Sequence, residues 1–411
     1  MRSNENLKTF SYLSANREEN FVILLPIINA IATIFVPYTS GSSINIGIVR
    51  AFLIGIFGLH FIISRYKNQF RIEVLTLIFI FYFLILIFIG QDIVTGLNVY
   101  LKFFVANLHL LFGIHYAKRP LFLKRISISI LIMLSMYLID FIFSNIFHFG
   151  LVSYAGVENE INFGGLGVNM AKCIASILLM LPIIYPQFST KISKQLIIIL
   201  AIAGTIQVLF AFKRSGIASL FLGYILILLF YPDPIKSIRL SLKIILFGVL
   251  LSPFIYNQIQ DNYQAREAAI RLDNQENLEK QARYVEYQRT LHEFQSQGIV
   301  YKLFGSELFN SRLYFKQRRT FHTDYMTLLA GSGLVGISLL ILHYTFIIRT
   351  LKKKFNLFPT NNNKLQFSVG LALTFSMLLF GLSGLIQSIE PRATILLFIG
   401  TLIGRPVFAK N

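Results

Sequence analysis

The sequence predicts an all-α membrane protein with about twelve transmembrane helices and one large hydrophilic loop. The chain has 411 residues, of which 55% are hydrophobic and 14% are charged. A soluble domain carries roughly 25% charged residues. Uninterrupted apolar runs, such as 72–90, 126–147 and 365–387, reach the ~18–20 residues that cross a bilayer. One soluble core cannot bury so many helices that are apolar on every side.

The spans can be placed along the chain from these apolar runs. The first twenty residues are polar and include basic side chains, so we expect a cytoplasmic tail rather than a cleavable signal peptide. Spans are predicted at 21–37, 45–63, 72–90, 97–116, 126–148, 164–186, 194–212, 215–231, 238–256, 321–348, 365–387 and 391–408. The chain thus divides into spans one to nine within 1–256, a loop at 257–320 and spans ten to twelve within 321–411.

Basic residues set the predicted orientation, because short cytoplasmic loops carry an excess of Lys and Arg. With the amino terminus inside, the basic residues of the inner connections are Arg65, Lys67, Arg71, Lys118, Arg119, Lys124, Arg125, Lys191, Lys194, Lys236, Arg239, Lys243, Arg349, Lys352, Lys353, Lys354 and Lys364. The opposite connections at 38–44, 91–96 and 149–163 contain no Lys or Arg. Both termini are therefore expected in the cytoplasm, and the net charge of +19 is explained mainly by topology, without a nucleic-acid partner.

The loop at 257–320 is the candidate extramembrane element, and long loops are exempt from the charge rule. Its stretch 261–297 is rich in Ala, Glu, Gln, Arg and Leu and has no Pro or Gly until Gly298. This composition predicts one or two helices, with the glycine as a C-terminal cap. The single cysteine, Cys173, excludes a disulfide within the chain and a cysteine-based metal cluster.

Four cations fall within or at the edges of predicted spans, namely Arg50, Lys102, Lys172 and Arg214. All four lie in the predicted outer half of the bilayer. A charged side chain at the bilayer centre would cost about 2.5–3.5 kcal/mol. They either extend to the interface and pair with acidic neighbours, or they line an outward-facing cationic chamber. Such a chamber suits a phosphate or pyrophosphate group. We favour the chamber for Lys172, which is deepest and shares its span with Asn169. The residues alone leave lipid phosphate chemistry and anion transport both open.

Three stretches resemble the bacterial O-antigen polymerase and O-antigen ligase family. They are Phe212-Lys213-Arg214-Ser215-Gly216 before a span; Ala282-Arg283-Tyr284-Val285-Glu286-Tyr287 through Leu303-Phe304-Gly305; and His322-Thr323-Asp324-Tyr325 with the glycine-containing 328–336. A fourth stretch, 165–171, resembles the glycine-asparagine start of a middle span. The resemblance covers residues 160–340, and the first four spans match in hydropathy alone. Many relatives have Asn or Ser after the histidine, and Thr323 keeps a polar group there.

The resemblance implies a metal-independent glycosyltransferase of the GT-C type, without a cofactor, whose donor is a glycan on undecaprenyl diphosphate. An acceptor sugar hydroxyl would attack the anomeric carbon while the lipid diphosphate leaves. Preorganised cations can stabilise the charge that develops on the leaving group. The residues that we assign to this binding are Arg214 and Arg283, with Lys172 and Arg319 behind them and Tyr325 and Asn169 beside them.

His322 is the residue that we expect to orient or deprotonate the acceptor hydroxyl, with Asp324 as substitute or partner. Each assignment has a structural alternative. His322 could be an interfacial side chain, Arg283 could lie on a solvated helix, and Arg319 could face anionic lipid. His109, near the middle of span four, is expected to be packed and neutral.

The leading functional hypothesis is a polymerase in the bacterial inner membrane that joins lipid-linked repeat units into O-antigen or capsule. An O-antigen ligase that transfers the glycan to lipid A core is the alternative in the same class. A lipid-linked oligosaccharide flippase and a passive scaffold are the alternatives from other classes. The expected partners are the undecaprenyl-diphosphate-linked oligosaccharide and membrane lipids, with a chain-length regulator as a further candidate.

Overall fold

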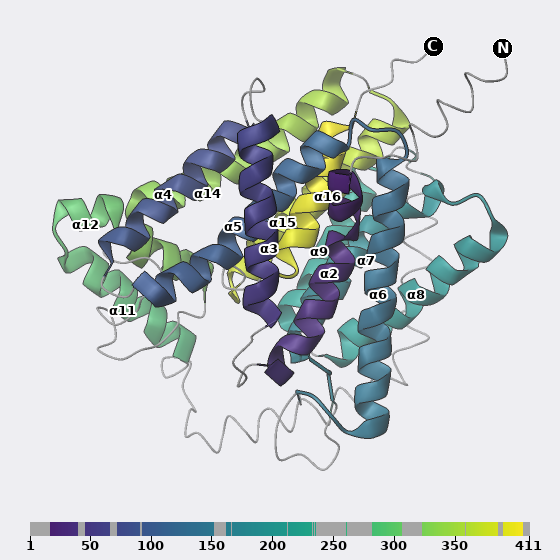
Figure 1. Ribbon diagram of the computed structural model, residues 1–411, viewed down its shortest axis with the longest axis horizontal. Coiled ribbons are helices and arrows are strands. Elements are labelled where there is room, and N and C mark those ends of the chain that lie inside the picture. Colours follow the sequence, from purple (N-terminus) through teal and green to yellow (C-terminus); the bar gives the residue numbers. More distant parts are fainter. Residues whose placement is uncertain are drawn as a thin grey trace.

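The computed structural model describes residues 17–39, 46–65, 72–90, 93–151, 162–165, 167–211, 213–231, 233, 235, 260, 282–305, 323–357, 359–384 and 389–405. Every named element in these ranges is a helix (Figure 1). The elements are α2 (Arg17–Thr39), α3 (Ile46–Arg65), α4 (Ile72–Ile89), α5 (Ile93–Tyr116), α6 (Phe122–Phe147), η1 (Gly167–Asn169), α7 (Met170–Ile184), η2 (Tyr185–Gln187), α8 (Lys191–Phe210), α9 (Arg214–Leu229), α11 (Ala282–Ser296), α12 (Ile299–Phe304), α14 (Asp324–Leu357), α15 (Asn361–Gly381) and α16 (Arg392–Gly404). The prediction of an all-α protein is confirmed.

Eight of the described helices are long and apolar enough to cross a membrane: α2, α3, α5, α6, α7, α8, α14 and α15. Three shorter apolar helices, α4, α9 and α16, coincide with further predicted spans. The predicted span at 238–256 lies outside the described residues. Many large apolar side chains on these helices are exposed, as expected for surfaces that face lipid. The chain is therefore a multi-pass membrane protein.

The helix α16 occupies the centre of the bundle, and its residues from Arg392 to Leu402 are all buried. It packs closely against α5 because small residues face one another. A Cβ atom on Gly113 would lie 2.3 Å from the carbonyl oxygen of Leu397, and one on Gly400 would lie 2.3 Å from that of Leu110. Small residues let membrane helices approach until their backbones touch. This approach fixes α16 inside the other helices.

The helix α14 is broken at Gly333, whose φ of 61° and ψ of −162° are not helical. This backbone conformation is open essentially to glycine alone. The break divides α14 into an entry arm, 324–332, and a long arm, 334–357. Asp324 on the entry arm and Tyr344 on the long arm line one pocket, whereas a straight helix would separate them by about 30 Å. The entry arm therefore folds back along the long arm.

The described part of the large loop contains two helices, α11 and α12, in agreement with the prediction for this region. The role predicted for Gly298 is wrong. This glycine has a φ of −63° and serves as the N-cap residue of α12, whereas a glycine C-cap adopts a left-handed conformation. The helix α11 ends at Ser296, two residues before it. Residues 261–281 of the predicted helical stretch lie outside the described residues.

Candidate functional site

The helices α7, α9 and α14 begin at one end of the bundle, and α15 ends there. We call this end the loop end. Lys172 lies there as the third residue of α7, and its side chain is 3% exposed. Its Nζ donates hydrogen bonds to the carbonyl oxygens of Gly384 at 2.9 Å and Ser383 at 3.4 Å, and it lies 5.8 Å from the ring centroid of Phe380. The ammonium group therefore points into the bundle and binds the turn that follows α15.

The Arg214-Ser215-Gly216 turn lies against the same turn after α15. The Ser383 hydroxyl donates to the Ser215 hydroxyl at 3.1 Å. Gly216 packs on α7, where an added Cβ atom would lie 3.1 Å from that of Ala171, the residue before Lys172. Arg214 itself is exposed at the start of α9. The structure thus gathers two of the predicted regions, around Lys172 and Arg214, at the end of α15.

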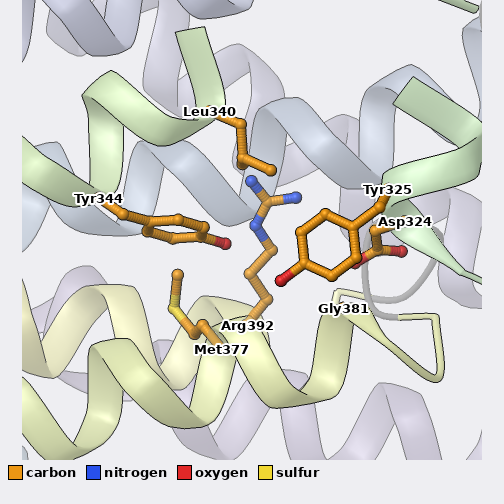
Figure 2. Close-up of a pocket in the computed structure, with 7 residues that line it drawn as sticks. All are labelled: Asp324, Tyr325, Leu340, Tyr344, Met377, Gly381 and Arg392. Carbon is orange, nitrogen blue, oxygen red and sulfur yellow. The ribbon is translucent and has the colours of Figure 1, made fainter. Parts of the chain in front are cut away.

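A pocket lies beside the end of α15. It is lined by Asp324, Tyr325, Leu340, Tyr344, Met377, Gly381 and Arg392 (Figure 2). The space within it is about 270 Å³ when the open solvent at its mouth is counted, and its enclosed part has room for about one water molecule. The Arg392 side chain extends between the rings of Tyr325 and Tyr344, and Asp324 lies beside Tyr325 (Figure 2). A cation and an acid from separate helices therefore share one cavity.

Arg392 is buried almost completely, with 2% of its surface exposed. Its guanidinium carbon lies 4.6 Å from the centroid of the Phe103 ring, a distance at which the ring face attracts a cation. The Nε atom has no hydrogen-bond partner among the described residues. A buried donor without a partner is costly, so the fold retains Arg392 here despite that cost.

The depth of Arg392 follows from the length of α16. The helix has 13 residues and is about 20 Å long, whereas a bilayer core is about 30 Å thick. Arg392 stacks on Phe103, which lies nearly three turns, or about 15 Å, beyond the first residue of α5. The helix α16 therefore begins inside the bundle, and the pocket reaches below the level of the loop end.

Asp324 and Tyr325 are held in place by the start of α14. The Thr323 hydroxyl accepts a hydrogen bond from the backbone N–H of Met326 at 3.3 Å, as an N-cap residue does. The Tyr325 hydroxyl donates to the carbonyl oxygen of Leu378 at 2.7 Å. Asp324, 8% exposed, occupies the first helical turn, where a negative charge is favourable. Thr323, the polar residue after the predicted histidine, thus caps the start of α14.

Two further charged residues of the bundle, Arg50 and Glu390, are buried, with 8% and 6% of their surfaces exposed. The Arg50 Nη1 atom donates to the Thr33 hydroxyl at 2.7 Å and to the carbonyl oxygen of Asn29 at 3.1 Å. Glu390 Oε2 accepts from the Thr394 hydroxyl at 2.9 Å. Arg50 is therefore turned into the bundle and does not extend to an interface.

The structure leaves some of the predicted site residues untested. His322 and Arg319 lie outside the described residues, and of Arg283 only the backbone, in the first turn of α11, is described. Asn169 is exposed at the start of α7 and makes no capping hydrogen bond. His109 is packed as expected, between the carbonyl oxygen of Val105 at 2.7 Å and the amide nitrogen of Asn29 at 3.0 Å.

The helix α11 connects the large loop to the pocket. Its Tyr287 and Phe294 pack against a cluster on the entry arm that consists of Met326, Leu329 and Ala330. This cluster directly follows Asp324 and Tyr325 in the chain. The helix that carries Arg283 therefore lies against the arm that carries the predicted acid.

Sequence reasoning missed Arg392 as a site residue. The available signal is a charged pair, Glu390 and Arg392, at the start of an apolar run, which by position alone is typical of an interface. No protein-family model matches this chain, and no curated protein matches it.

Proposed function

We propose that the protein is a membrane-embedded glycosyltransferase that joins glycan repeat units carried on undecaprenyl diphosphate, at the non-cytoplasmic face of the bacterial inner membrane. The observation that carries this proposal is the buried Arg392 guanidinium, which faces a cavity shared with Asp324. Gly381 lines that cavity, while Ser383 and Gly384 bind Ser215 and Lys172. Gly381 at the end of α15 therefore lies in the pocket of Arg392, and the residues just after it contact Lys172 and Ser215, the residue after Arg214.

Arginine suits the binding of a diphosphate because its planar fork of donors matches phosphate oxygens. In a cavity that excludes water, such donors stabilise the negative charge that develops as the leaving group departs. We assign this role to Arg392 within the pocket and to Arg214 at the exposed start of α9, where the helix dipole also favours an anion. Lys172 is a positioning residue, since its ammonium group already binds the turn after α15.

The proposed reaction is a single displacement. The acceptor hydroxyl oxygen forms a bond to the anomeric carbon of the donor, and the bond from that carbon to the phosphate oxygen breaks. The hydroxyl proton passes to Asp324 or to His322, and undecaprenyl diphosphate leaves with its electron pair. Asp324 supports this assignment because it lies in the pocket at the start of α14, within reach of a group that Arg392 binds.

The test is elongation of a defined undecaprenyl-diphosphate oligosaccharide by the purified protein in nanodiscs. Wild type is expected to produce longer glycans, and Arg392→Gln is expected to lower the rate by about 10²–10³-fold, as the loss of one such donor does. Arg349→Gln removes an exposed arginine from the far part of α14 and should leave the rate unchanged. Transport of the labelled lipid across vesicles without elongation would support the flippase instead.

Cells that lack the gene separate the two enzymes of the same class. Loss of a polymerase leaves one repeat unit on the surface acceptor, whereas loss of a ligase leaves that acceptor bare. We expect the single repeat unit. An Arg392→Gln protein that elongates the glycan at the wild-type rate would contradict the proposed role of the pocket in either enzyme.

A further inference from the structure

The short helix α12 exposes apolar side chains although it belongs to the large hydrophilic loop. Ile299, Val300 and Tyr301 are 69%, 62% and 54% exposed, and Phe304 is 48% exposed. Lys302 is the charged residue of this helix. Large apolar side chains that are exposed together on one short helix are typical of an interaction site.

Hydrogen bonds fix the level of α12 relative to the transmembrane helices. The Tyr82 hydroxyl of α4 lies 2.8 Å from the carbonyl oxygen of Ser332 and 3.3 Å from that of Phe304, the last residue of α12. Tyr82 lies about two turns before Ile89, the end of α4, which is roughly 10 Å along the helix axis. The end of α12 therefore lies beside the interior of α4 and not beyond its end.

The neighbouring surface of α4 is typical of contact with lipid. Ile85, Phe88 and Ile89 occupy the last turns of α4 and are 58%, 61% and 69% exposed. In Figure 1, α12 lies beside α4 and α14 at the edge of the molecule. The exposed apolar residues of α12 thus belong to a helix that lies beside a surface of α4 typical of contact with hydrocarbon.

Two glycines hold α12 at this level. Gly305, with a φ of 81°, approaches the entry arm so closely that an added Cβ atom would lie 2.3 Å from the backbone of Gly331. An added Cβ atom on Gly333 would lie 2.5 Å from the carbonyl oxygen of Leu303. The end of α12 is therefore packed, backbone to backbone, against the break in α14. This packing fixes its position relative to the transmembrane helices.

We infer that α12 is inserted into the hydrocarbon of the outer leaflet and anchors the large loop in the bilayer. Its partner is the acyl chains of membrane lipids. Insertion places its apolar residues out of water, and the long side chain of Lys302 can extend its ammonium group to the head groups. This inference does not depend on the proposed enzymatic activity.

The test measures the depth of one probe in the bilayer. In a Cys173→Ala background, Val300→Cys carries an environment-sensitive fluorophore in nanodiscs of phosphatidylethanolamine and phosphatidylglycerol. We expect nitroxides on the lipid acyl chains to quench this probe several-fold more than iodide in the water does. Gln295→Cys is the matched control, because it is an exposed position on α11 in the same loop, and it should show the opposite preference.

Equal quenching of both probes by iodide would overturn the inference. A single symmetrical peak in size-exclusion chromatography, required of each labelled protein, shows that the label has not unfolded it. If the label at 300 prevents folding, Val300→Asp and Gln295→Asp are compared without a label. Insertion predicts that only Val300→Asp lowers the amount of folded protein in the membrane, whereas equal amounts would again overturn it.

Discussion

Arg392 combines two properties that rarely occur together in a membrane protein. It is buried at the start of the central helix α16, and its Nε atom has no hydrogen-bond partner among the described residues. A buried charge is a weak source of stability, because desolvation offsets the attraction to its neighbours. The ring face of Phe103 attracts the guanidinium, and Asp324 is the acidic residue in the same pocket. We therefore assign Arg392 to binding rather than to folding.

This assignment predicts that Arg392→Met separates stability from activity. Methionine fills a similar volume without a charge, so it avoids the desolvation cost of a buried guanidinium, which is on the order of several kcal/mol. The thermal unfolding temperature in detergent should stay the same or rise, while elongation of the lipid-linked glycan is lost. A marked fall in that temperature would show that the arginine is needed for folding. Arg349→Met at the exposed position on α14 is the control for both measurements.

At the scale of elements, the break in α14 builds the pocket. Without it, the entry arm would continue straight, and Asp324 and Tyr325 would lie far from Tyr344 and Arg392. The same break receives α12, whose following residue, Gly305, contacts Gly331 and Gly333. One local feature of the backbone thus positions the predicted acid and the end of the large loop together.

We predict that Gly333→Ala destabilises the protein and abolishes elongation. The required φ of 61° and ψ of −162° costs a residue with a side chain about 1–3 kcal/mol, and the new methyl group would meet the backbone of Leu303. Gly298→Ala is the matched control, because this glycine has a φ of −63° and no atom within 4 Å of an added Cβ. Thermal unfolding and elongation are measured for both. Equal unfolding temperatures would contradict the proposed role of the break.

At the scale of the whole molecule, Lys172 at the loop end and Arg392 below its level place two buried cations near the end of α15. Lys172 and Arg392 lie on different helices, and the turn after α15 runs between them. A cationic region of this kind raises the local concentration of an anionic substrate. Its accessibility from one side of the membrane depends on the orientation of the chain.

The orientation predicts which engineered cysteines react in intact cells. In the Cys173→Ala background, a membrane-impermeant maleimide should label Gln295→Cys in the large loop but not Lys352→Cys near the opposite end of α14. Both positions are exposed, so the difference reports on the side of the membrane. Permeabilised cells, in which both should react, provide the control. Labelling of Lys352→Cys before permeabilisation would refute the cytoplasmic placement of the termini.

The predicted spans that fall within the described residues coincide with helices, because a run of apolar residues is a local property of the chain. The single span predicted at 321–348 is wrong, since the non-helical Gly333 divides it. Among the predicted site residues, Lys172, Asp324 and Tyr325 lie around the end of α15 in the structure. The glycines next to these residues in the sequence, and their positions at the ends of predicted spans, indicated that they belong to a site. Arg392 was missed since its position at the start of a span is typical of an interface, and the short α16 that buries it cannot be recognised from hydropathy.

The sequence by itself determined the class of the protein, the positions of its apolar helices and the unequal distribution of its basic residues, because each depends on composition within a short window. Only the tertiary structure decided that α14 folds back on itself, that α16 begins inside the bundle and that α12 lies beside α4. These features depend on contacts between residues far apart in the chain, such as Arg392 with Phe103 and Tyr82 with Ser332. No local pattern of hydrophobicity encodes such contacts.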